Sequence, residues 1–507
     1  MVVQDRDRDL ALTHRSLFAT LSITLAAGCA TFPVAADEGG PPWIRVDTPH
    51  FSLATDMKQV PAEELAHMLE DWWSAMTVAF ARIGAAGHTT IGEGDDEDDP
   101  EPLLVIALRS QGEREAVHYR LGGEFIAFPL VPPAISIGSV DGYRGREVLK
   151  HELAHALLHQ YLPRVPHWLT EGIAFYLQSA DLDRERRVAT WGALSQSQIR
   201  GWSEYGPTVS TQSLLNPARW TPSNNAAMEV RAGLLVHMLI NRHPDEFRCY
   251  LGKLEGDLEG DPIADCFPSR VRWDFELDSY SFESFASQET PFEPSAAFAR
   301  SAPMGDSSVH AVLALLDFMV LLTIEEEFRP PRAERARQNV MRALDLEPDN
   351  MLAGLLLLTR TKLDATRTDS LTKAMVARHG GDWRAWVVRA HMRGLPADEL
   401  REATARAHAL APNETEVLRL KASEAVQEGR WADARALGIR ARLGGAEDIA
   451  DRTILFVASA QLGHCEEAVK WTRSPAETKR MNAFLLRFQE ERDLPKRACS
   501  VDDQDLK

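Results

Sequence analysis

Hydrophobic and polar residues follow two different periodicities along the first half of the chain. Residues 43–56 alternate apolar and polar side chains, which is typical of a half-buried strand. Residues 61–84 instead repeat apolar side chains at helical spacing, which predicts a helix. Short apolar runs at 103–110 and 125–139 predict further strands, and the prolines in the second run favour an edge position.

Two helices separated by prolines are predicted next. Residues 143–162 form a long helical pattern that Pro163 and Pro166 end, and residues 167–180 begin a second helix. A further helix is predicted over 226–247. The N-terminal half is therefore predicted to be a mixed sheet with helices.

From about residue 305 the pattern becomes purely helical. Residues 336–350 and 403–415 share one pattern, in which Ala is followed by apolar residues, then by Pro, and then by an acidic residue or Asn. The prolines of the two copies, Pro348 and Pro412, lie 64 residues apart. This is close to two periods of a helical hairpin of roughly 34 residues, and the segments resemble tetratricopeptide repeats. The expected architecture is an irregular α-solenoid.

The predicted fold class is therefore α+β, with a mixed sheet and helices followed by an all-α helical-repeat region. Within the helical part, residues 350–400 show no clean copy of the repeat. The predicted organisation is a leader (1–29), a linker (30–42), a mixed domain (43–285), a linker (286–304) and an α-solenoid (305–500).

Composition and charge limit the classes of function. The chain has 507 residues, of which 44% are hydrophobic and 26% charged, as in folded proteins of two or three domains. Its net charge of -19 argues against nucleic acid or an anionic membrane surface as the main partner, because phosphates would be repelled.

The N-terminus has the pattern of an export signal. The apolar run at 16–29 follows Arg15 and is shorter than the roughly 20 residues of a membrane span. It ends in LAAGC, which resembles a bacterial lipobox and would make Cys29 a lipidated first residue. Cleavage after residues 34–36 is the alternative. Both predict an exported protein of the periplasm or bacterial envelope, and the membrane enters only through a lipid anchor.

Four cysteines remain after either cleavage. Their spacing suggests two local disulfides, Cys249 to Cys266 and Cys465 to Cys499, as expected in an oxidising compartment. Four free buried thiols are the alternative.

A motif for metal chemistry lies on the helix predicted over 143–162. His151 and His155 are four residues apart, so both imidazoles project from one face at a spacing that one tetrahedral zinc can bridge. Glu152 lies beside them, where it could take a proton from a zinc-bound water without binding the metal.

Hydrolysis by zinc needs a third protein ligand and an open position. His159 lies a further turn along the helix, too far for a metal held by the first two histidines, and is expected on the surface or behind the ligands. A metzincin would need Gly and His where Leu158 and Tyr161 stand. Glu171 remains, with 15 residues between it and His155, which is enough for a helix end, a turn and a facing helix.

HELAH followed by HWLTEGIAFYL resembles the gluzincin zinc metallopeptidases, and most closely their peptidase MA-like group. The segment WLTEGIA differs at Thr170 and Ile173 from the corresponding aminopeptidase N segment, and its spacing to the glutamate is shorter. The resemblance extends over residues 43 to about 280, with the specific motifs in 148–177.

The resemblance implies that His151, His155 and Glu171 bind Zn²⁺, and that Glu152 is the general base and later the proton donor. Gly172 would let the second helix approach the first closely. The edge strand expected near 134–138 would hold an extended peptide.

Three residues, Tyr205, Tyr176 and His237, are open candidates for stabilising the oxyanion. The expected function is thus an exported zinc metallopeptidase that acts on peptides or proteins, with a protein partner for the helical repeats. An inactive envelope scaffold that acts through those repeats is the alternative. Hydrolysis of a substrate other than a peptide is a third reading.

Overall fold

The structure is a computed structural model, and it describes residues 32–491 with internal gaps. The leader 1–29 with Cys29, and also Tyr205 and Cys499, lie outside the described residues, and the predictions made for them stay predictions. The gaps are 85–100, 118–122, 138–142, 163–164, 194–197, 199, 202–208, 217–218, 222–223, 256–261, 269, 281–286, 296–298, 322–325, 327–328, 362, 393, 444–448 and 473–474.

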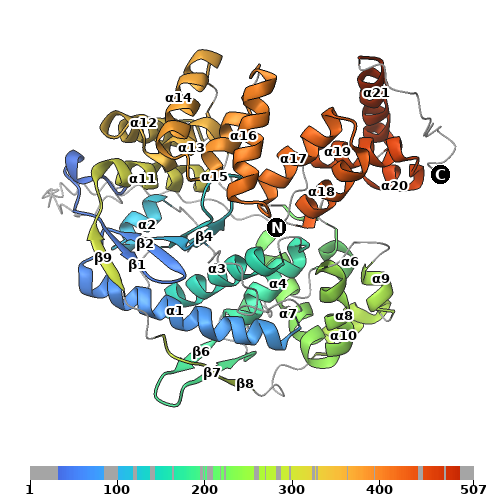
Figure 1. Ribbon diagram of the computed structural model, residues 1–507. Coiled ribbons are helices and arrows are strands. Elements are labelled where there is room, and N and C mark those ends of the chain that lie inside the picture. Colours follow the sequence, from blue (N-terminus) through green and yellow to red (C-terminus); the bar gives the residue numbers. More distant parts are fainter. Residues whose placement is uncertain are drawn as a thin grey trace, which may run out of the picture.

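A mixed six-stranded sheet organises the N-terminal half (Figure 1). Its strands are β1 (Ile44–Asp47), β2 (Phe51–Thr55), β3 (Leu103–Ala107), β4 (Gly123–Ile126), β5 (Ala134–Ile137) and β9 (Arg300–Pro303). They lie in the order β4-β5-β3-β2-β1-β9. The central strands β2, β3 and β5 are parallel, whereas β1, β4 and β9 pair antiparallel with their neighbours.

Two strand predictions differ from the structure. The single strand predicted over 43–56 is a hairpin of β1 and β2, closed where the Thr48 amide donates to the Phe51 carbonyl at 2.9 Å. The run 125–139 divides into β4 and β5, because its prolines lie in the connection between them. The prediction that 134–138 forms the edge is wrong, since β5 pairs with β3 and β4 on its two sides, and β4 is the edge.

Helices α1 (Gln59–Arg82), α3 (Tyr143–Tyr161), α4 (His167–Leu177) and α7 (Asn225–Arg242) pack together beside one face of the sheet. Alternate strand residues such as Leu53 and Val105 point into this core, where Leu153 of α3 and Ile173 of α4 meet them. The apolar residues that are buried in this core explain why α3 and α4 form where the sequence pattern predicts them.

The opposite face of the sheet is covered by α2 (Gln111–Val117), α11 (Asp306–Val320) and α12 (Arg329–Leu346). Ala54, Ile106 and Ala134, which alternate with the residues of the first core, share a second core with these helices. The sheet therefore lies between two helical layers, and the C-terminal helices complete one of them (Figure 1).

Residues 286–304, expected to be a linker, contain two strands. β9 pairs with β1, and β8 (Gln288–Pro291) pairs with β7 in a second sheet. That sheet has the order β6-β7-β8, with β6 (Asp181–Asp183) and β7 (Val188–Trp191). Neither Gln-Glu-Thr-Pro nor Arg-Ser-Ala-Pro has the alternation that marks a strand, so the sequence carried no signal for them.

The segment expected to be the first linker is also fixed in place. The Arg335 guanidinium of α12 lies 3.6 Å from the centroid of the Phe32 ring. Asp37, in the short 3-10 helix η1 (Ala36–Glu38), accepts hydrogen bonds from His310 Nε2 at 3.0 Å and Arg342 Nη2 at 2.8 Å. Residues 32–38 thus fasten the start of the described chain to α11 and α12.

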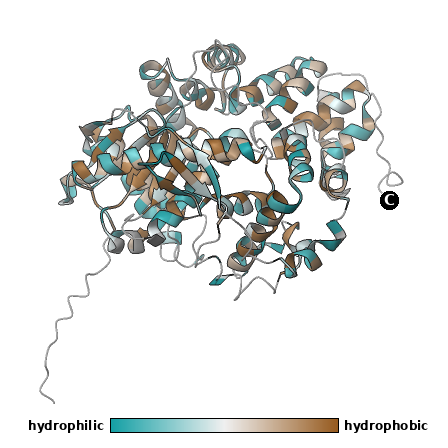
Figure 2. Ribbon diagram, turned by 90° about the horizontal axis from the view of Figure 1, so that it is seen from below, coloured by the Kyte–Doolittle hydropathy of each residue, from teal (hydrophilic) through white to brown (hydrophobic). Residues whose placement is uncertain are grey.

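The C-terminal region is entirely helical within its described residues, so the predicted fold class is confirmed. Its remaining helices are α13 (Met351–Arg360), α14 (Ala365–Arg378), α15 (Trp383–Ala390), α16 (Ala397–Leu410), α17 (Thr415–Gln427), α18 (Trp431–Leu443), α19 (Ile449–Leu462), α20 (Cys465–Lys470) and α21 (Pro475–Glu491). Most of them pack on helices that are adjacent or next but one in sequence. Hydrophobic and hydrophilic positions alternate along the helices in Figure 2, as in amphipathic packing.

These helices repeat at a regular interval. Every other helix of this region, α13, α15, α17 and α19, begins at Met351, Trp383, Thr415 and Ile449, which are 32, 32 and 34 residues apart. Helices α14 and α15 lie in the part of the chain in which no clean repeat was visible in the sequence. Nearest-neighbour packing at this interval is typical of helical-repeat proteins.

The helix predicted over 226–247 is broken after His243, where Pro244 begins α8 (Pro244–Glu255). The smaller elements near it are α6 (Thr211–Leu214), α9 (Pro262–Cys266), η4 (Arg270–Arg272) and α10 (Trp273–Asp278). The predicted disulfide between Cys249 and Cys266 is present and joins α8 to α9. Cys465 is disulfide-bonded too. The predicted partner, Cys499, lies outside the described residues, so that pairing stays a prediction.

Among the described helices, none combines the length and the apolar character needed to cross a bilayer.

Candidate metal centre

Three ligand atoms from α3 and α4 converge on one point. His151 Nε2 and His155 Nε2 are 3.0 Å apart, and Glu171 Oε2 lies 3.3 Å from the first and 3.7 Å from the second. Within the described part of the chain, these three residues form the group that could hold a metal ion. The i, i+4 spacing on α3 and the turn back into α4 produce this arrangement, as the sequence predicted.

The separations fit a tetrahedral zinc. Ligands about 2.0–2.1 Å from one zinc lie about 3.3 Å from each other in a tetrahedron. The three separations scatter around that value, and all three side chains are largely buried. Two neutral imidazoles and a carboxylate are also the donor set of many hydrolytic zinc sites. The residues therefore fit Zn²⁺, although the separations alone do not identify the metal.

Gln178 fixes the orientation of the His151 ring. Its Oε1 accepts a hydrogen bond from His151 Nδ1 at 3.0 Å, which leaves Nε2 as the nitrogen that faces the other ligands and could bind a metal once it has lost its proton. Gln178 follows the last residue of α4, and Lys150 of α3 donates to the nearby Ala180 carbonyl at 2.5 Å. Lys150 thereby ties this end of α4 to the helix that carries the histidines.

Burial and mutual charge shift the pKa of each of the three ligand residues in the metal-free protein. Burial would lower the pKa of His151, but the hydrogen bond and charge of Glu171 outweigh it and raise that pKa to about 9. Burial lowers the pKa of His155 to about 4. Burial opposes ionisation of Glu171, yet His155 and His151 hold its pKa below the usual value. Metal binding must therefore release a proton from His151.

Further carboxyl groups surround the ligands. Burial, followed by the charges of Glu171 and Glu152, raises the pKa of Glu229 on α7 to about 7. Burial and the Glu152 charge raise the pKa of Glu124 on β4 to about 8, and Glu124 Oε2 is buried without a hydrogen-bond partner among the described residues. A bound divalent cation would relieve this repulsion between carboxylates.

Glu152 is held against the edge strand. The Phe125 amide of β4 donates to Glu152 Oε2 at 2.7 Å. Burial raises the pKa of Glu152 to about 7, in the range where a carboxyl group can both accept and donate a proton at neutral pH.

The other histidines of the motif region are not part of the ligand group. His159 is exposed, with its ring centroid 5.7 Å from that of Phe125. His167 is half exposed, and its Nδ1 lies 3.6 Å from Glu171 Oε1, the oxygen that faces away from the other two ligands. The placement of His159 agrees with the sequence prediction.

The structure gives Tyr176 and His237 contacts other than the metal ligands. Their rings pack together at 5.5 Å between centroids, and His237 bonds the Tyr280 hydroxyl and the Gly192 carbonyl, each at 2.8 Å. Both side chains are buried, and these contacts are those of packing residues.

Gly172 allows a close approach, but to a different helix from the one expected. A Cβ at this position would lie 2.3 Å from Val236 Cγ2 and 2.8 Å from the Ala232 carbonyl oxygen. Both belong to α7, so the prediction of a close contact with the first helix is corrected. Gly172 brings α4 against α7, which carries Glu229.

Sequence reasoning missed Gln178, Glu229 and the Phe125 amide. Gln178 lies seven residues, or two helical turns, after Glu171 and so falls on the same helix face, which is a signal that the sequence did contain. Glu229 and Phe125 come from distant elements, and no spacing relates them to the motif.

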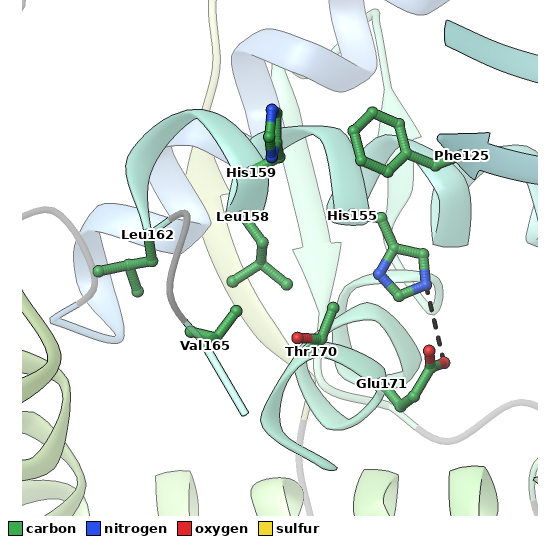
Figure 3. Close-up of a pocket in the computed structure, with 8 residues that line it drawn as sticks. All are labelled: Phe125, His155, Leu158, His159, Leu162, Val165, Thr170 and Glu171. Carbon is green, nitrogen blue, oxygen red and sulfur yellow. Dashed lines mark ion pairs between the residues drawn. The ribbon is translucent and has the colours of Figure 1, made fainter. Parts of the chain in front are cut away.

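A pocket of about 270 Å³ opens beside the ligand group (Figure 3). It lies between α3 and the first turn of α4, and two ligands, His155 and Glu171, form one side of it.

In comparisons with known proteins, no family model matches the chain, and neither a curated protein nor a solved structure is significantly similar to it.

Proposed function

We propose that this protein is an exported zinc metallopeptidase, a hydrolase of the gluzincin type. The observation that carries the proposal is the separation of the His151, His155 and Glu171 ligand atoms by 3.0–3.7 Å, together with Glu152 next to them in sequence. A zinc held only for structure usually has four protein ligands and needs no base, whereas a catalytic zinc keeps a position open.

When bound, zinc would acidify a water molecule and polarise the substrate carbonyl. Glu152 is the residue that would take the proton from that water and later deliver it to the leaving amine. Its hydrogen bond to the Phe125 amide keeps the carboxyl group between α3 and the edge strand. Gln178 would keep His151 in the tautomer that binds metal.

The edge strand β4 supports a peptide as substrate. An extended peptide can add to an exposed strand through main-chain hydrogen bonds. β4 has a partner on one side only within the described sheet, and it carries the amide that holds Glu152. A peptide on β4 would therefore run past the general base and the metal ligands.

Two features support export. The Cys249–Cys266 disulfide is typical of proteins that fold in an oxidising compartment. The sequence of the leader has the pattern of a signal peptide.

The test compares zinc content and peptide cleavage in the wild type, Glu152→Gln and Glu171→Ala. We expect one zinc per chain in the wild type and Glu152→Gln, weak retention in Glu171→Ala, and cleavage of a mixed fluorogenic peptide library by the wild type but by neither of these two variants. Glu64→Gln, an exposed change on α1, is the matched control. Unchanged cleavage by Glu152→Gln would reject the mechanism, and full zinc loading of Glu171→Ala would remove Glu171 from the ligand set.

A second candidate is a scaffold that binds a protein partner through its helical repeats. The regular 32–34-residue interval of α13, α15, α17 and α19 favours it, because such arrays commonly bind proteins. Stoichiometric capture of a partner by residues 305–507 within the full chain, without cleavage of any peptide, would support the scaffold over the peptidase.

A further inference from the structure

The pocket beside the ligand group has mainly apolar walls. Leu158 and Leu162 are 1% and 3% exposed, and Val165 and Phe125 are partly buried. The full lining is Phe125, His155, Leu158, His159, Leu162, Val165, Thr170 and Glu171. In Figure 3, Leu158, Leu162 and Val165 form one side of the cavity, opposite His155 and Glu171.

The polar side chains of Thr170 and His159 change the apolar character of the pocket little. The Thr170 hydroxyl donates to the Pro166 carbonyl at 3.3 Å, so it is already engaged within its own helix. His159 is exposed, beside Phe125 in Figure 3. Glu171, the acidic residue of the lining, would be engaged by the metal in the zinc-loaded protein. A charged side chain placed against the Leu158, Leu162 and Val165 walls would then lose its hydration without gaining an opposite charge.

The volume limits what the pocket can hold. Cavities that enclose a drug-sized ligand are about 300–1,000 Å³, so 270 Å³ falls just below that range. It corresponds to about nine water-sized groups at ~30 Å³ each. One leucine, methionine or phenylalanine side chain fits this space, whereas a longer stretch of peptide does not.

Phe125 links the pocket to the edge strand. Its side chain lines the cavity, and its amide, on β4, bonds the general base. A peptide that pairs with β4 would direct alternate side chains toward the same face of the sheet. The residue nearest the metal ligands would therefore direct its side chain into the pocket.

We propose that this pocket selects a large uncharged apolar side chain at a substrate residue next to the scissile bond. The inference rests on the proposed peptidase function. It names the substrate class as peptides with Leu, Met or Phe at that position, and it makes Val165 and Leu162 specificity-determining residues.

The kinetic test uses the zinc-loaded full chain and fluorogenic peptides that differ only at the residues flanking the cleavage site. We expect kcat/KM for Leu or Phe to exceed that for Ala, Asp and Lys by at least ~10-fold, since an apolar pocket discriminates by ~10–200-fold per methylene. Product masses identify which flanking residue is selected. Equal rates across the series would overturn the proposal.

Two substitutions change the size of the pocket in opposite directions. Val165→Trp should reduce the Leu-to-Ala ratio of kcat/KM at least ~10-fold by filling the cavity, and Val165→Ala should raise the Trp-to-Leu ratio. Val60→Trp, on the exposed surface of α1, is the matched control and should leave both ratios unchanged. Zinc content measured on each variant reports whether the site has folded. An unaltered Leu-to-Ala ratio in folded Val165→Trp would refute the assignment.

A binding measurement separates this inference from the proposed function. Zinc-loaded Glu152→Gln should bind labelled Leu and Phe peptides at least ~10-fold more tightly than Ala or Asp peptides, measured by fluorescence anisotropy. If the wild type cleaves nothing while this selectivity is found, the peptidase function fails and the pocket assignment stands. If the wild type cleaves peptides but neither rates nor affinities depend on the side chain, the pocket assignment fails alone.

Discussion

Replacing Gln178 by Leu should weaken zinc binding without removing a ligand. The change deletes the acceptor that His151 Nδ1 uses at 3.0 Å, an ordinary length for an N–H···O bond. The ring would then lose the restraint that directs Nε2 toward His155 and Glu171. Leu and Gln are similar in size, so the change mainly removes polarity.

The magnitude follows from the exposure of the two partners. Loss of such an orienting partner typically costs 10–100-fold in metal affinity. The His151 side chain is 18% exposed and Gln178 is also partly exposed, so water can partly replace the lost acceptor. We therefore expect the lower part of that range, a zinc Kd about 10–30-fold higher, which equals about 1.4–2 kcal/mol.

Zinc affinity is measured by competition with a chromophoric chelator at fixed pH. Gln178→Glu keeps an acceptor and should bind zinc at least as tightly as the wild type. Gln198→Leu is the matched control, because Gln198 is another glutamine that bonds α4, donating to the Phe175 carbonyl at 2.6 Å, but it does not contact a ligand. A Kd for Gln178→Leu within threefold of wild type, or an equal loss in Gln198→Leu, would refute the reasoning.

Three further changes test the surroundings of the site. Gly172→Ala should lower the free energy of unfolding by about 1–3 kcal/mol through overpacking against α7, measured by urea denaturation; unchanged stability would contradict the close approach. Replacing Cys249 and Cys266 by Ser should cost about 3 kcal/mol at unchanged zinc affinity, and a midpoint equal to wild type would count against the disulfide. Asp37→Ala should lower stability by about 1–3 kcal/mol, because buried His310 loses its acceptor, and a calorimetric transition identical to wild type would argue that residues 32–38 are not fastened.

The ligand group was predictable because its determinants are local. The spacing of His151 and His155 places two imidazoles on one helix face, and the prolines between the helices return the chain so that Glu171 meets them. Gln178 belongs to the same local pattern. Glu229 was not predictable, because its position depends on α7 packing against Gly172, a contact between elements that a single sequence does not reveal.

The contrast between local determinants and contacts between distant elements also explains which parts of the fold could be predicted. Helices with strong periodicity, such as α1, α3 and α4, begin and end within a few residues of the prediction. The order of the strands depends on pairing between distant segments, which the sequence pattern does not show. For this reason the sequence predicted β5 at the edge of the sheet and merged β4 with β5 into one strand. β9 is a strand only because β1 offers it hydrogen bonds, since its own four residues have no strand pattern.

The pairing of β1 with β9 has a consequence for biosynthesis. Ile44 pairs with Pro303, so the six-stranded sheet is complete only when more than 250 further residues have been made. The apolar residues on its second face are covered only after α11 has also been made. Such distant pairing slows folding and delays it until the chain is long. We expect a nascent chain shorter than about 320 residues to stay unfolded and open to proteases, so that under the proposed export the chain could be transported before its group of metal ligands forms.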